Sequence, residues 1–586
     1  MKKTTRLHLL IILIVGLLPL LWFKESTLIF GHDAGIPFEP SVHFLDRFHV
    51  WSQRFGIGTD QSAALLGAFF IHGLEYLLNQ LPISLQIQQK IQFVFWFTLP
   101  GLTMYFFTSR IWPGKKYLAL VSSIIYMLNY FLLQGWFIAE RTKFSIYAAL
   151  PLVTYFALSY LTKRMSGVQA ILLAGLTLGL LNGGGSIPLY GGLLIVFFVT
   201  YTYILFLNPR LKTLLSIVIF SVGTGLVYIL LNGYWILPYI FYVLSFYSRD
   251  LANAGGAEGV LNWATYLTQG STLMNLLIGQ GVPEWYLNEF HPYAKNILYN
   301  PLFIFISFSL LALFMTAIFV VRLAKDKFYL YLFCLIGMVA IIFSAGPNSP
   351  FGFIYELCVR YIPGFAMFRS SYYKFNYAVW FSYSILIAFS VEFLLMRLEK
   401  RKNLNFLVPI IIVVICVLYF GFHYPVLNGS FFDYNQNPNQ KISNRINVPS
   451  YVFEFGKWVN KQDPNERYLL LPELHDSKYI SYQWGYWSLA GINTLQSQNS
   501  FVQNTFLIPE SGRILMKEMY AALRNRDFES FSDYLSVFAI DKIVLHKDVD
   551  WQNPVWGTTD PRFYERIIEE SRKFTKEKEF GSTTGS

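Results

Sequence analysis

Eleven long apolar runs constrain this 586-residue chain more than any other feature. A helix needs roughly 17 to 25 apolar residues to cross about 30 Å of hydrocarbon. Only 14% of the residues are charged, against about 25% in soluble domains. The sequence therefore predicts an α-helical polytopic membrane protein with about 11 transmembrane helices. The runs lie near residues 7–23, 91–109, 117–134, 144–161, 168–182, 187–207, 213–231, 299–321, 328–344, 375–396 and 404–422.

The charges between these runs predict an orientation, because short cytoplasmic loops of membrane proteins have an excess of Lys and Arg. With the N-terminus inside, every inner loop is basic. The long outer segments, 24–90, 232–298, 345–374 and all residues after 422, then contain most of the acids. We predict a multi-pass plasma-membrane protein with a cytoplasmic N-terminus. The net charge of +11 is explained by these loops and gives no continuous basic face for nucleic acid.

Two further apolar stretches are interpreted as non-spanning. Counting residues 62–79 as a span would turn every later basic loop outward. We therefore expect an amphipathic helix along the outer interface, with His72 and Glu75 three positions apart on one side. Residues 235–247 are too short to cross and are predicted to be a re-entrant or interfacial piece.

The composition changes after Tyr424. Residues 1–423 are predicted to be the transmembrane domain and residues 424–447 a polar linker. Residues 448–586 are predicted to be an extracytoplasmic α/β domain of mixed helices and strands, incomplete at its C-terminus. The expected helices are 448–461, 510–526 and 527–538, and the expected strands are 467–471, 478–483 and 541–546.

Candidate chemistry begins about ten residues after the first run, where glycines and prolines make a stiff turn around Asp33. A carboxylate at the edge of a low-dielectric wall has its charged form disfavoured, which makes it a better general base. Asp33 is therefore the first candidate for a catalytic base. The alternatives are a solvated loop acid or a helix cap.

Other residues of the same segment have secondary roles. Asp46 with Arg47 is interpreted first as an ion pair within the loop, and Asp46 is the second catalytic candidate. His32, Glu39 and His49 are candidates for orienting a substrate. No His-x-x-x-His pair or carboxylate cluster indicates a metal site, although Asp33, Glu39 and Asp46 could bind one through oxygen atoms.

Charged residues in the other outer segments are candidates for holding a substrate. A fixed cation near the membrane is costly unless it is paired, and a phosphate is a suitable partner. Snorkelling to lipid head groups is the alternative for such a cation. Two pairs flank the fourth and tenth runs, and two residues lie in the outer segment 248–298. The substrate-binding candidates are Glu140, Arg141, Arg249, His291, Arg369 and Lys374.

Four short stretches resemble a known superfamily. They are PSVHFLDRFHVW (40–51), LNGYWILP (231–238), FAMFRS (365–370) and YQWGY (482–486). Together with the first span, the outer loop with an early acid and the long tail, they resemble the GT-C superfamily of polyprenyl-phosphate-sugar-dependent glycosyltransferases. They are similar to the large arabinofuranosyltransferases of the mycobacterial cell envelope and, more loosely, to the YfhO-type membrane glycosyltransferases. The likeness covers roughly residues 1–550.

This resemblance implies a glycosyltransferase that moves a sugar from a polyprenyl-phosphate donor to an envelope glycan or lipid acceptor outside the membrane. It implies a first-loop acid as base, which Asp33 matches, and a donor-phosphate contact near Arg369. Displacement in one step would invert the anomeric centre. It implies no further cofactor, and a divalent metal is left open. The sugar, the acceptor and the oligomeric state are not indicated.

Two other classes of protein stay open. A lipid or polysaccharide transporter would place acids and bases inside several spans, and the spans of this chain are almost free of them. A non-catalytic scaffold for envelope assembly would not depend on Asp33.

Overall fold

The computed structural model describes residues 3–30, 37–54, 56–61, 66–286, 291–320, 327–401, 403–433, 444–474, 479–488, 492–504, 510–553 and 557–581. The chain forms two compact units, which we call the membrane unit and the outer unit. The membrane unit contains residues 1–22, 90–136 and 141–435, and the outer unit contains residues 23–89, 137–140 and 436–586. The first outer segment is thus part of the same unit as the C-terminal region, whereas the sequence placed it with the spans.

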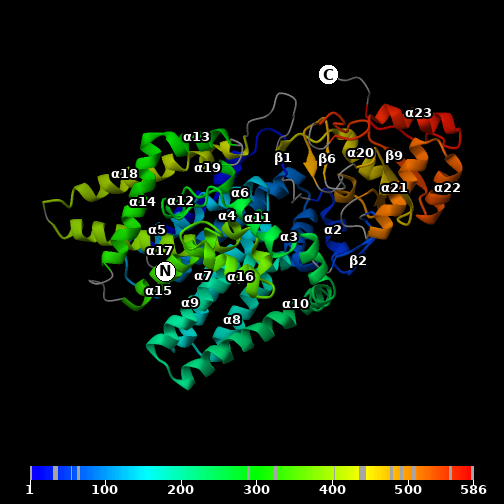
Figure 1. The fold of residues 1–586 in the computed structure, drawn as a ribbon. Helices are drawn as coiled ribbons and strands as arrows, with labels where there is room; N and C mark the ends of the chain where they lie inside the picture. The colour runs from blue at the N-terminus through cyan, green and yellow to red at the C-terminus, as the bar shows by residue number, and fades with distance from the viewer. Residues whose placement is uncertain are drawn as a thin grey trace. The chain divides into compact units, whose positions relative to one another are not determined.

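The membrane unit is helical (Figure 1). Its helices are α1 (Lys3–Gly16), α4 (Leu85–Ile111), α5 (Leu118–Met127), α6 (Phe131–Phe137), α7 (Arg141–Leu161), α8 (Gly167–Leu180), α9 (Gly191–Leu207), α10 (Leu211–Asn253), α11 (Gly256–Leu267), α12 (Leu273–Leu277), α13 (Pro292–Tyr299), α14 (Pro301–Val320), α15 (Lys327–Ser344), α16 (Gly352–Tyr361), α17 (Ser371–Glu399), α18 (Leu407–Phe422) and α19 (Tyr424–Asn428). Short 3-10 turns include η1 (Leu18–Trp22), η4 (Ile187–Tyr190), η5 (Pro283–Trp285) and η7 (Phe365–Phe368).

All eleven predicted apolar runs form helices. Within the described ranges, eight helical segments are long and apolar enough to cross a membrane, and nine if the bent pair α5–α6 counts as one span. The other two runs form α8, of 14 residues, and α18, of 16 residues, which are shorter than a span usually needs. The polytopic fold class is confirmed, and the number of eleven spans stays a prediction.

Helix α17 is the centre of the membrane unit, where α5, α9, α14 and α15 all pack against it. The approach of α9 is especially close. A Cβ atom at Gly191 would lie 2.8 Å from the Lys374 carbonyl oxygen, and one at Gly192 would lie 2.6 Å from the Tyr377 Cβ. These two glycines therefore let the backbones of α9 and α17 come together, as small residues do between membrane helices.

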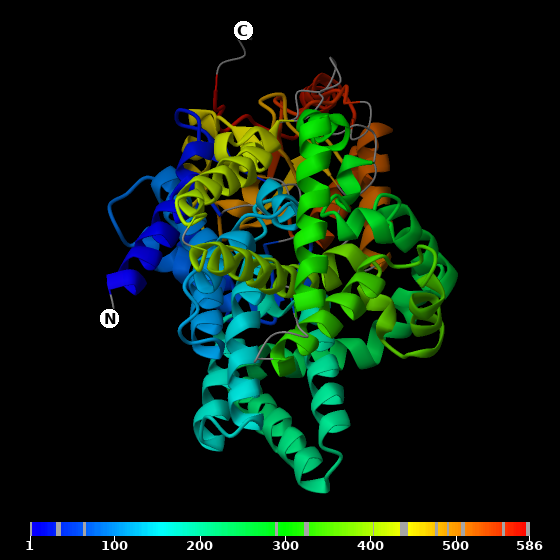
Figure 2. The same ribbon diagram turned by 90° about the vertical axis from the view of Figure 1, so that its left-hand side faces the viewer.

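Residues 235–247 are not a separate piece, and their interfacial or re-entrant placement stays a prediction. They continue α10, a single helix of 43 residues with Pro238 inside it, and α10 runs beside α8 in the turned view (Figure 2). A proline inside a helix removes one backbone hydrogen bond, and α10 continues past Pro238. Before the proline, the Asn232 carboxamide oxygen accepts hydrogen bonds from Asn182 and Trp235 at 2.8 Å each, so the polar groups are satisfied inside the unit.

The start of α5 is capped by a distant carboxylate. The first backbone N–H groups of a helix have no partner within the helix. Glu392 on α17, only 3% exposed, accepts from the backbone N–H groups of Lys116 at 2.9 Å, Tyr117 at 2.6 Å and Leu118 at 3.1 Å. Glu392 therefore has a structural task.

The outer unit combines the first outer segment with the C-terminal region. Its elements are β1 (Leu28–Ile29), α2 (Pro40–Asp46), β2 (Trp51–Ser52), β3 (Thr59–Asp60), η2 (Leu66–Ala68), α3 (Phe69–Asn79), β4 (Arg445–Ile446), α20 (Ser450–Val459), β5 (Arg467–Leu471), β6 (Ile480–Ser481), β7 (Trp487–Ser488), β8 (Ser500–Val502), α21 (Glu510–Arg524), α22 (Phe528–Val537), β9 (Lys542–Leu545) and α23 (Pro561–Ser571). The predicted strand 478–483 is formed only at β6, and Lys478 lies outside the described residues.

A three-stranded parallel sheet in the order β8–β5–β9 confirms the C-terminal α/β region. Side chains of a strand alternate between its two faces. Leu469 and Leu471 of β5 pack on one face with residues of α21, α22 and α23, and Tyr468 and Leu470 pack on the other face with residues of α20. Burial on both faces is typical of parallel sheets, so this region is a three-layer α/β/α arrangement.

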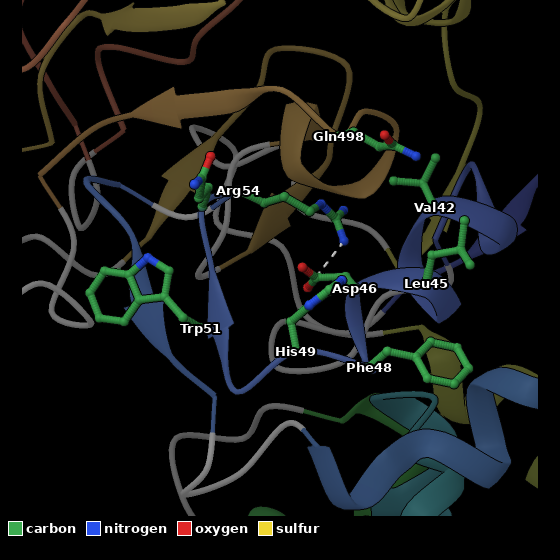
Figure 3. Close-up of a pocket in the computed structure, with 9 residues that line it drawn as sticks. Val42, Leu45, Asp46, Phe48, His49, Trp51, Arg54 and Gln498 are labelled. Atoms are coloured by element: carbon green, nitrogen blue, oxygen red, sulfur yellow. Dashed lines mark ion pairs between the residues drawn. The ribbon is translucent and has the colours of Figure 1, made fainter. Parts of the chain in front are cut away.

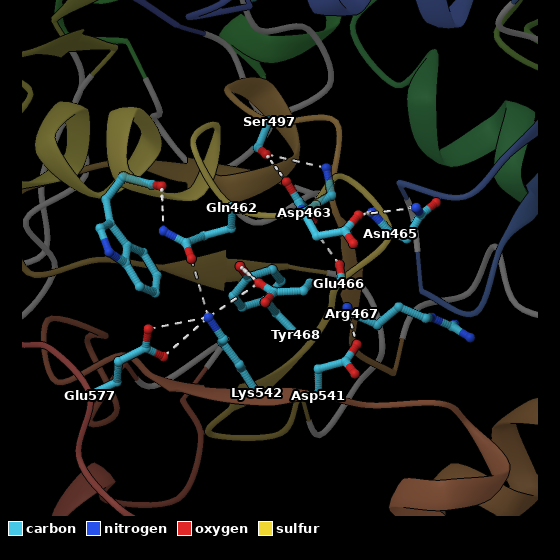
Figure 4. Close-up of polar contacts among 12 residues, drawn as sticks. Gln462, Asp463, Asn465, Glu466, Arg467, Tyr468, Ser497, Asp541, Lys542 and Glu577 are labelled. Carbon is cyan, nitrogen blue, oxygen red and sulfur yellow. Dashed lines mark hydrogen bonds and ion pairs between the residues drawn. The ribbon is translucent and has the colours of Figure 1, made fainter.

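Charged residues join β5 and β9 where these strands begin (Figure 4). The Lys542 Nζ lies 3.2 Å from Glu466 and 3.1 Å from Glu577. The Arg467 backbone N–H donates to Asp541 at 2.9 Å. Apolar contacts, rather than charged ones, link the N-terminal and C-terminal segments of the outer unit. Leu28 of β1 pairs with Ile446 of β4, and both belong to a core cluster with Phe30 and Phe38.

Replacement of the capping carboxylate tests this account of the membrane unit. In Glu392→Ala, three backbone N–H groups at the start of α5 lose their acceptor, and we expect the free energy of unfolding to fall by about 1–3 kcal/mol or more. Chemical unfolding in detergent measures it. Glu399→Ala, on the same helix, removes the acceptor of the Lys116 ammonium and of the Tyr117 hydroxyl but of no backbone N–H group, and should cost less. Equal losses in the two variants would contradict the capping role.

Candidate functional site

Two of the predicted site residues, His32 and Asp33, lie outside the described residues. The rest of the first outer segment is described. Helix α2 begins at Pro40, at its N1 position, where a proline fits because that N–H has no helical partner. Glu39 precedes it at the N-cap position without a capping hydrogen bond from its side chain. Helix α2 ends at Asp46 and is followed by the hairpin of β2 and β3, in which Trp51 pairs with Asp60.

The end of α2, the hairpin and one C-terminal loop line a pocket of about 610 Å³ (Figure 3). Its walls combine aromatic, aliphatic and polar side chains around a central ion pair. The lining residues are Val42, Leu45, Asp46, Phe48, His49, Trp51, Gln53, Arg54 and Gln498. All of them belong to the outer unit.

The ion pair of this pocket is between Asp46 and Arg54, at 3.6 Å between Oδ2 and Nη1, and both side chains are buried. The interpretation of Asp46 and Arg47 as an ion pair was wrong, because neighbouring residues of a helix point in different directions. Arg47 instead donates to the Gln61 side chain. Gln61 in turn donates to the carbonyl oxygens of Asp46 and His49, at 3.1 and 3.2 Å, and so braces the end of α2.

Arg54 connects this pair to a wider buried network. Its Nε donates to the Ser497 carbonyl oxygen at 3.0 Å, and its Nη2 lies 3.2 Å from His43 Nδ1. The His43 ring contacts the His72 ring at 5.0 Å between centroids, and His72 Nδ1 lies 2.5 Å from the fully buried Glu75. His72 and Glu75 thus lie on one side of α3 (Phe69–Asn79), as the sequence predicted.

The two buried guanidiniums remain charged at neutral pH. Burial lowers the pKa of Arg47 to about 10. The neighbouring Arg54 also lowers this pKa, whereas the carboxylates of Asp46 and Glu75 raise it. Burial also lowers the pKa of Arg54, opposed by attraction to Asp46. Arg54 and His43 were not singled out from the sequence. The signal was present for Arg54, because a basic residue in an outer segment runs against the charge bias.

Glu39 has a different environment from Asp46. Burial raises the pKa of Glu39, and the attraction of Lys457 on α20 only partly lowers it. A larger protonated fraction suits a group that donates a hydrogen bond to a substrate, which keeps Glu39 a candidate for that role.

In the membrane unit, two buried cations lie at the start of α7. Arg141 is the first residue of α7 and is 6% exposed, and Lys143 is 7% exposed. The Lys143 ammonium donates to the Gln134 side chain of α6 and lies 5.1 Å from the Tyr373 ring centroid of α17. Tyr373 also hydrogen-bonds to Glu284 of η5. The start of a helix has a partial positive charge, so two buried basic side chains and a helix N-terminus lie together in this part of the membrane unit.

The other predicted substrate-binding residues are in varied surroundings. Arg369 is exposed at the end of η7, and Lys374 is partly buried in the first turn of α17. Arg249 is exposed on α10, within a helix rather than a loop. Burial lowers the pKa of His291 to about 4, opposed by a hydrogen bond with the Asp433 backbone. His291 is therefore neutral at pH 7 and supplies no positive charge.

Glu140 is partly buried in the connection between α6 and α7. Within the described ranges, no group of three or more His, Cys, Asp or Glu side chains is arranged to hold a metal ion.

The family model described as Alpha-(1->3)-arabinofuranosyltransferase, N-terminal GT-C domain, matches residues 33–586. The chain belongs to this GT-C arabinofuranosyltransferase family. The resemblance stated from the sequence is thus confirmed. No match to the chain was found among curated protein sequences.

Two solved structures of AftD show the same fold as this chain. Arabinofuranosyltransferase AftD from Mycobacteria matches with a TM-score of 0.63 and 13% identity, over 99% of this chain and 38% of that one. A mutant form of the same enzyme gives 0.61 and 14%, over 99% and 39%. The apo oligosaccharyltransferase of Archaeoglobus fulgidus gives 0.47 and 13%, over 96% and 73%. The present GT-C chain spans about 38% of the length of AftD.

Removal of the central guanidinium tests the buried network. In Arg54→Met, Asp46 keeps a buried charge without its ion-pair partner, and we expect the free energy of unfolding to fall by about 3–5 kcal/mol. Arg360→Met breaks a surface pair with Glu258, in which both side chains are more than a third exposed, and should change stability little. Thermal unfolding of the purified protein compares the two. A loss no greater for Arg54→Met than for Arg360→Met would overturn the buried-network assignment.

The raised pKa of Glu39 predicts a pH-dependent effect. An acid whose folded-state pKa lies above the ordinary value of 4.5 stabilises the fold below that value, and the contribution is lost as pH rises through the folded-state pKa. Glu39→Gln should therefore raise Tm at pH 7 and leave it unchanged at pH 4. The exposed Glu454→Gln is the control. The same change in Tm at both pH values would contradict this assignment.

Proposed function

We propose that this chain is an integral membrane glycosyltransferase that moves a sugar from a polyprenyl-phosphate donor to a cell-envelope glycan or lipid acceptor. The observation that carries the proposal is the family match over residues 33–586. The family description supplies the sugar class, an arabinofuranosyl residue. The acceptor is a hydroxyl on the extracytoplasmic face, because the basic short loops favour a cytoplasmic N-terminus and an outer C-terminal region.

The start of α7 is our proposed contact for the donor phosphate. Arg141 and Lys143 are buried basic side chains at the N-terminal end of α7, where phosphate groups bind readily. A cation that is already in place stabilises the charge that accumulates on the leaving phosphate in the transition state. Arg141 and Lys143 are better candidates for the phosphate contact than Arg369, because salt screens a buried charge less than an exposed one. The exposed Arg369 is better placed to contact lipid head groups. Lys374, partly buried at the start of α17, stays a second candidate.

The proposed reaction is a single displacement at the anomeric carbon. Asp33 takes the proton from the acceptor hydroxyl while the acceptor oxygen forms a bond to the anomeric carbon. The bond from that carbon to the phosphate oxygen breaks, and polyprenyl phosphate leaves with the electron pair. One displacement inverts the anomeric centre. Asp46 is a weaker candidate for the base, because its carboxylate is already paired with Arg54.

The proposal is tested with purified protein in liposomes that contain a radiolabelled polyprenyl-phosphoryl arabinofuranose and a soluble arabinofuranosyl acceptor. Asp33→Asn should transfer sugar about 10²–10⁴-fold more slowly than wild type, because a general base contributes about that factor. Glu25→Gln, an exposed acid of the same segment, should transfer at the wild-type rate.

Two outcomes would count against the proposal. Transfer by Asp33→Ala at the wild-type rate would remove Asp33 as the base. Absence of transfer by the wild-type chain with every lipid-linked donor offered would favour a scaffold, and movement of intact donor across the bilayer would favour a transporter.

A further inference from the structure

Trp51 has an unusual position on the hairpin of the outer unit. Gly58, on the opposite side of the turn, has a φ of +105°, and a Cβ atom there would lie 2.5 Å from the Trp51 Cζ2. The indole ring therefore lies directly on the Gly58 backbone, where a side chain would displace it. The Trp51 side chain is nevertheless 52% exposed, so the surface of the ring turned away from Gly58 is open to solvent.

The pocket around Trp51 has both apolar and polar lining residues. Phe48 and Leu45, at the end of α2, are 60% and 49% exposed and lie on the other side of the pocket from Trp51 (Figure 3). His49, Gln53 and Gln498 are exposed along the lining and offer hydrogen-bond donors and acceptors. The volume of about 610 Å³ is within the range of pockets for small ligands.

The charge of the lining selects among ligands. Its described residues include one carboxylate and one guanidinium, Asp46 and Arg54, which are paired and cancel each other. A phosphate or an acidic sugar requires a surplus of cations, and the described lining has no Lys or Arg besides the paired Arg54. A neutral molecule with an apolar face and many hydroxyl groups fits this lining best.

We propose that this pocket binds neutral saccharide units of the acceptor glycan, with one sugar ring stacked on Trp51. The C–H face of a sugar ring packs on the indole, as flat apolar surfaces do on aromatic side chains. Its hydroxyl groups hydrogen-bond to Gln53, Gln498 and His49, which fix the orientation. The identity of the glycan as the acceptor rests on the proposed glycosyltransferase function, whereas the binding of a neutral glycan does not.

The test measures glycan binding without any donor lipid. Full-length protein in nanodiscs is titrated with a neutral arabinofuranosyl hexasaccharide, by calorimetry and by saturation-transfer NMR. Trp51→Ala should weaken binding about tenfold or more, the order found when an aromatic stacking partner is removed. Trp51→Phe, which keeps a smaller ring and the hairpin, should weaken it less. Trp263→Ala removes a tryptophan of α11 that is 46% exposed in the other unit and should leave binding unchanged.

Several outcomes would overturn the proposal. They are equal binding by wild type and Trp51→Ala, an equal loss in Trp263→Ala, and equal or tighter binding of a polyuronic oligosaccharide or of inorganic phosphate at the same site. Circular dichroism and Tm of each variant separate loss of the ring from loss of the fold. If Trp51→Ala fails to fold, Gln498→Ala with Gln53→Ala replaces it, and unchanged binding in that double variant would also overturn the proposal.

Transfer kinetics separate this inference from the proposed function. If both are right, Trp51→Phe raises KM for the acceptor and leaves KM for the donor unchanged. Trp51-dependent glycan binding without any sugar transfer supports the pocket and contradicts the proposed function. Sugar transfer that is insensitive to Trp51, with no binding of the hexasaccharide, contradicts the pocket alone.

Discussion

The outer unit depends on the contacts of one buried group, the guanidinium of Arg54. A buried charge is costly unless partners replace its water. Here the partners come from both ends of the chain, Asp46 in the first outer segment and the Ser497 carbonyl in the C-terminal region. Next to it the Gly56 backbone N–H donates to the Phe501 carbonyl oxygen at 3.1 Å. The pocket walls at α2 and at Gln498 keep their spacing because these contacts hold both segments.

The membrane unit uses buried charges in two ways that can be told apart by what surrounds them. Glu392 accepts three backbone N–H groups at the start of α5, where a negative charge is favourable. Arg141 and Lys143 stand at the start of α7, where a positive charge is unfavourable. Glu392 therefore stabilises the fold by capping the start of α5. We assign the two cations to an anionic substrate because they are buried at a helix N-terminus, where phosphate groups bind.

Local patterns predicted the parts of the fold that depend on local physics. All eleven apolar runs are helical, and strand 467–471 was placed at the residues of β5. Features that depend on distant partners were missed. Strand β8 was not foreseen, because it is only three residues long and its partner β5 lies more than 25 residues away. The sequence divided the 43-residue helix α10 into two pieces, because only the lengths of the apolar runs were considered. The packing of Asn232 between these pieces could not be seen from those lengths.

The candidate site shows the same division. Spacing alone placed His72 beside Glu75, three residues apart on one helix. Spacing also predicted Arg47 as the partner of Asp46. The actual partner is Arg54, which the hairpin brings back to the end of α2, and sequence spacing does not show this approach. The indole of Trp51 on Gly58 likewise depends on the positive φ of that glycine, which a sequence pattern does not reveal.

The most direct measurement for the account as a whole is an experimental structure of the full chain with a bound polyprenyl phosphate. We predict density for the phosphate within about 3 Å of the Lys143 ammonium and the Arg141 guanidinium, and its loss when both residues are replaced by Met. Phosphate density found only at exposed cations such as Arg369, or unchanged in the double variant, would contradict the assignment of the start of α7 as the donor site.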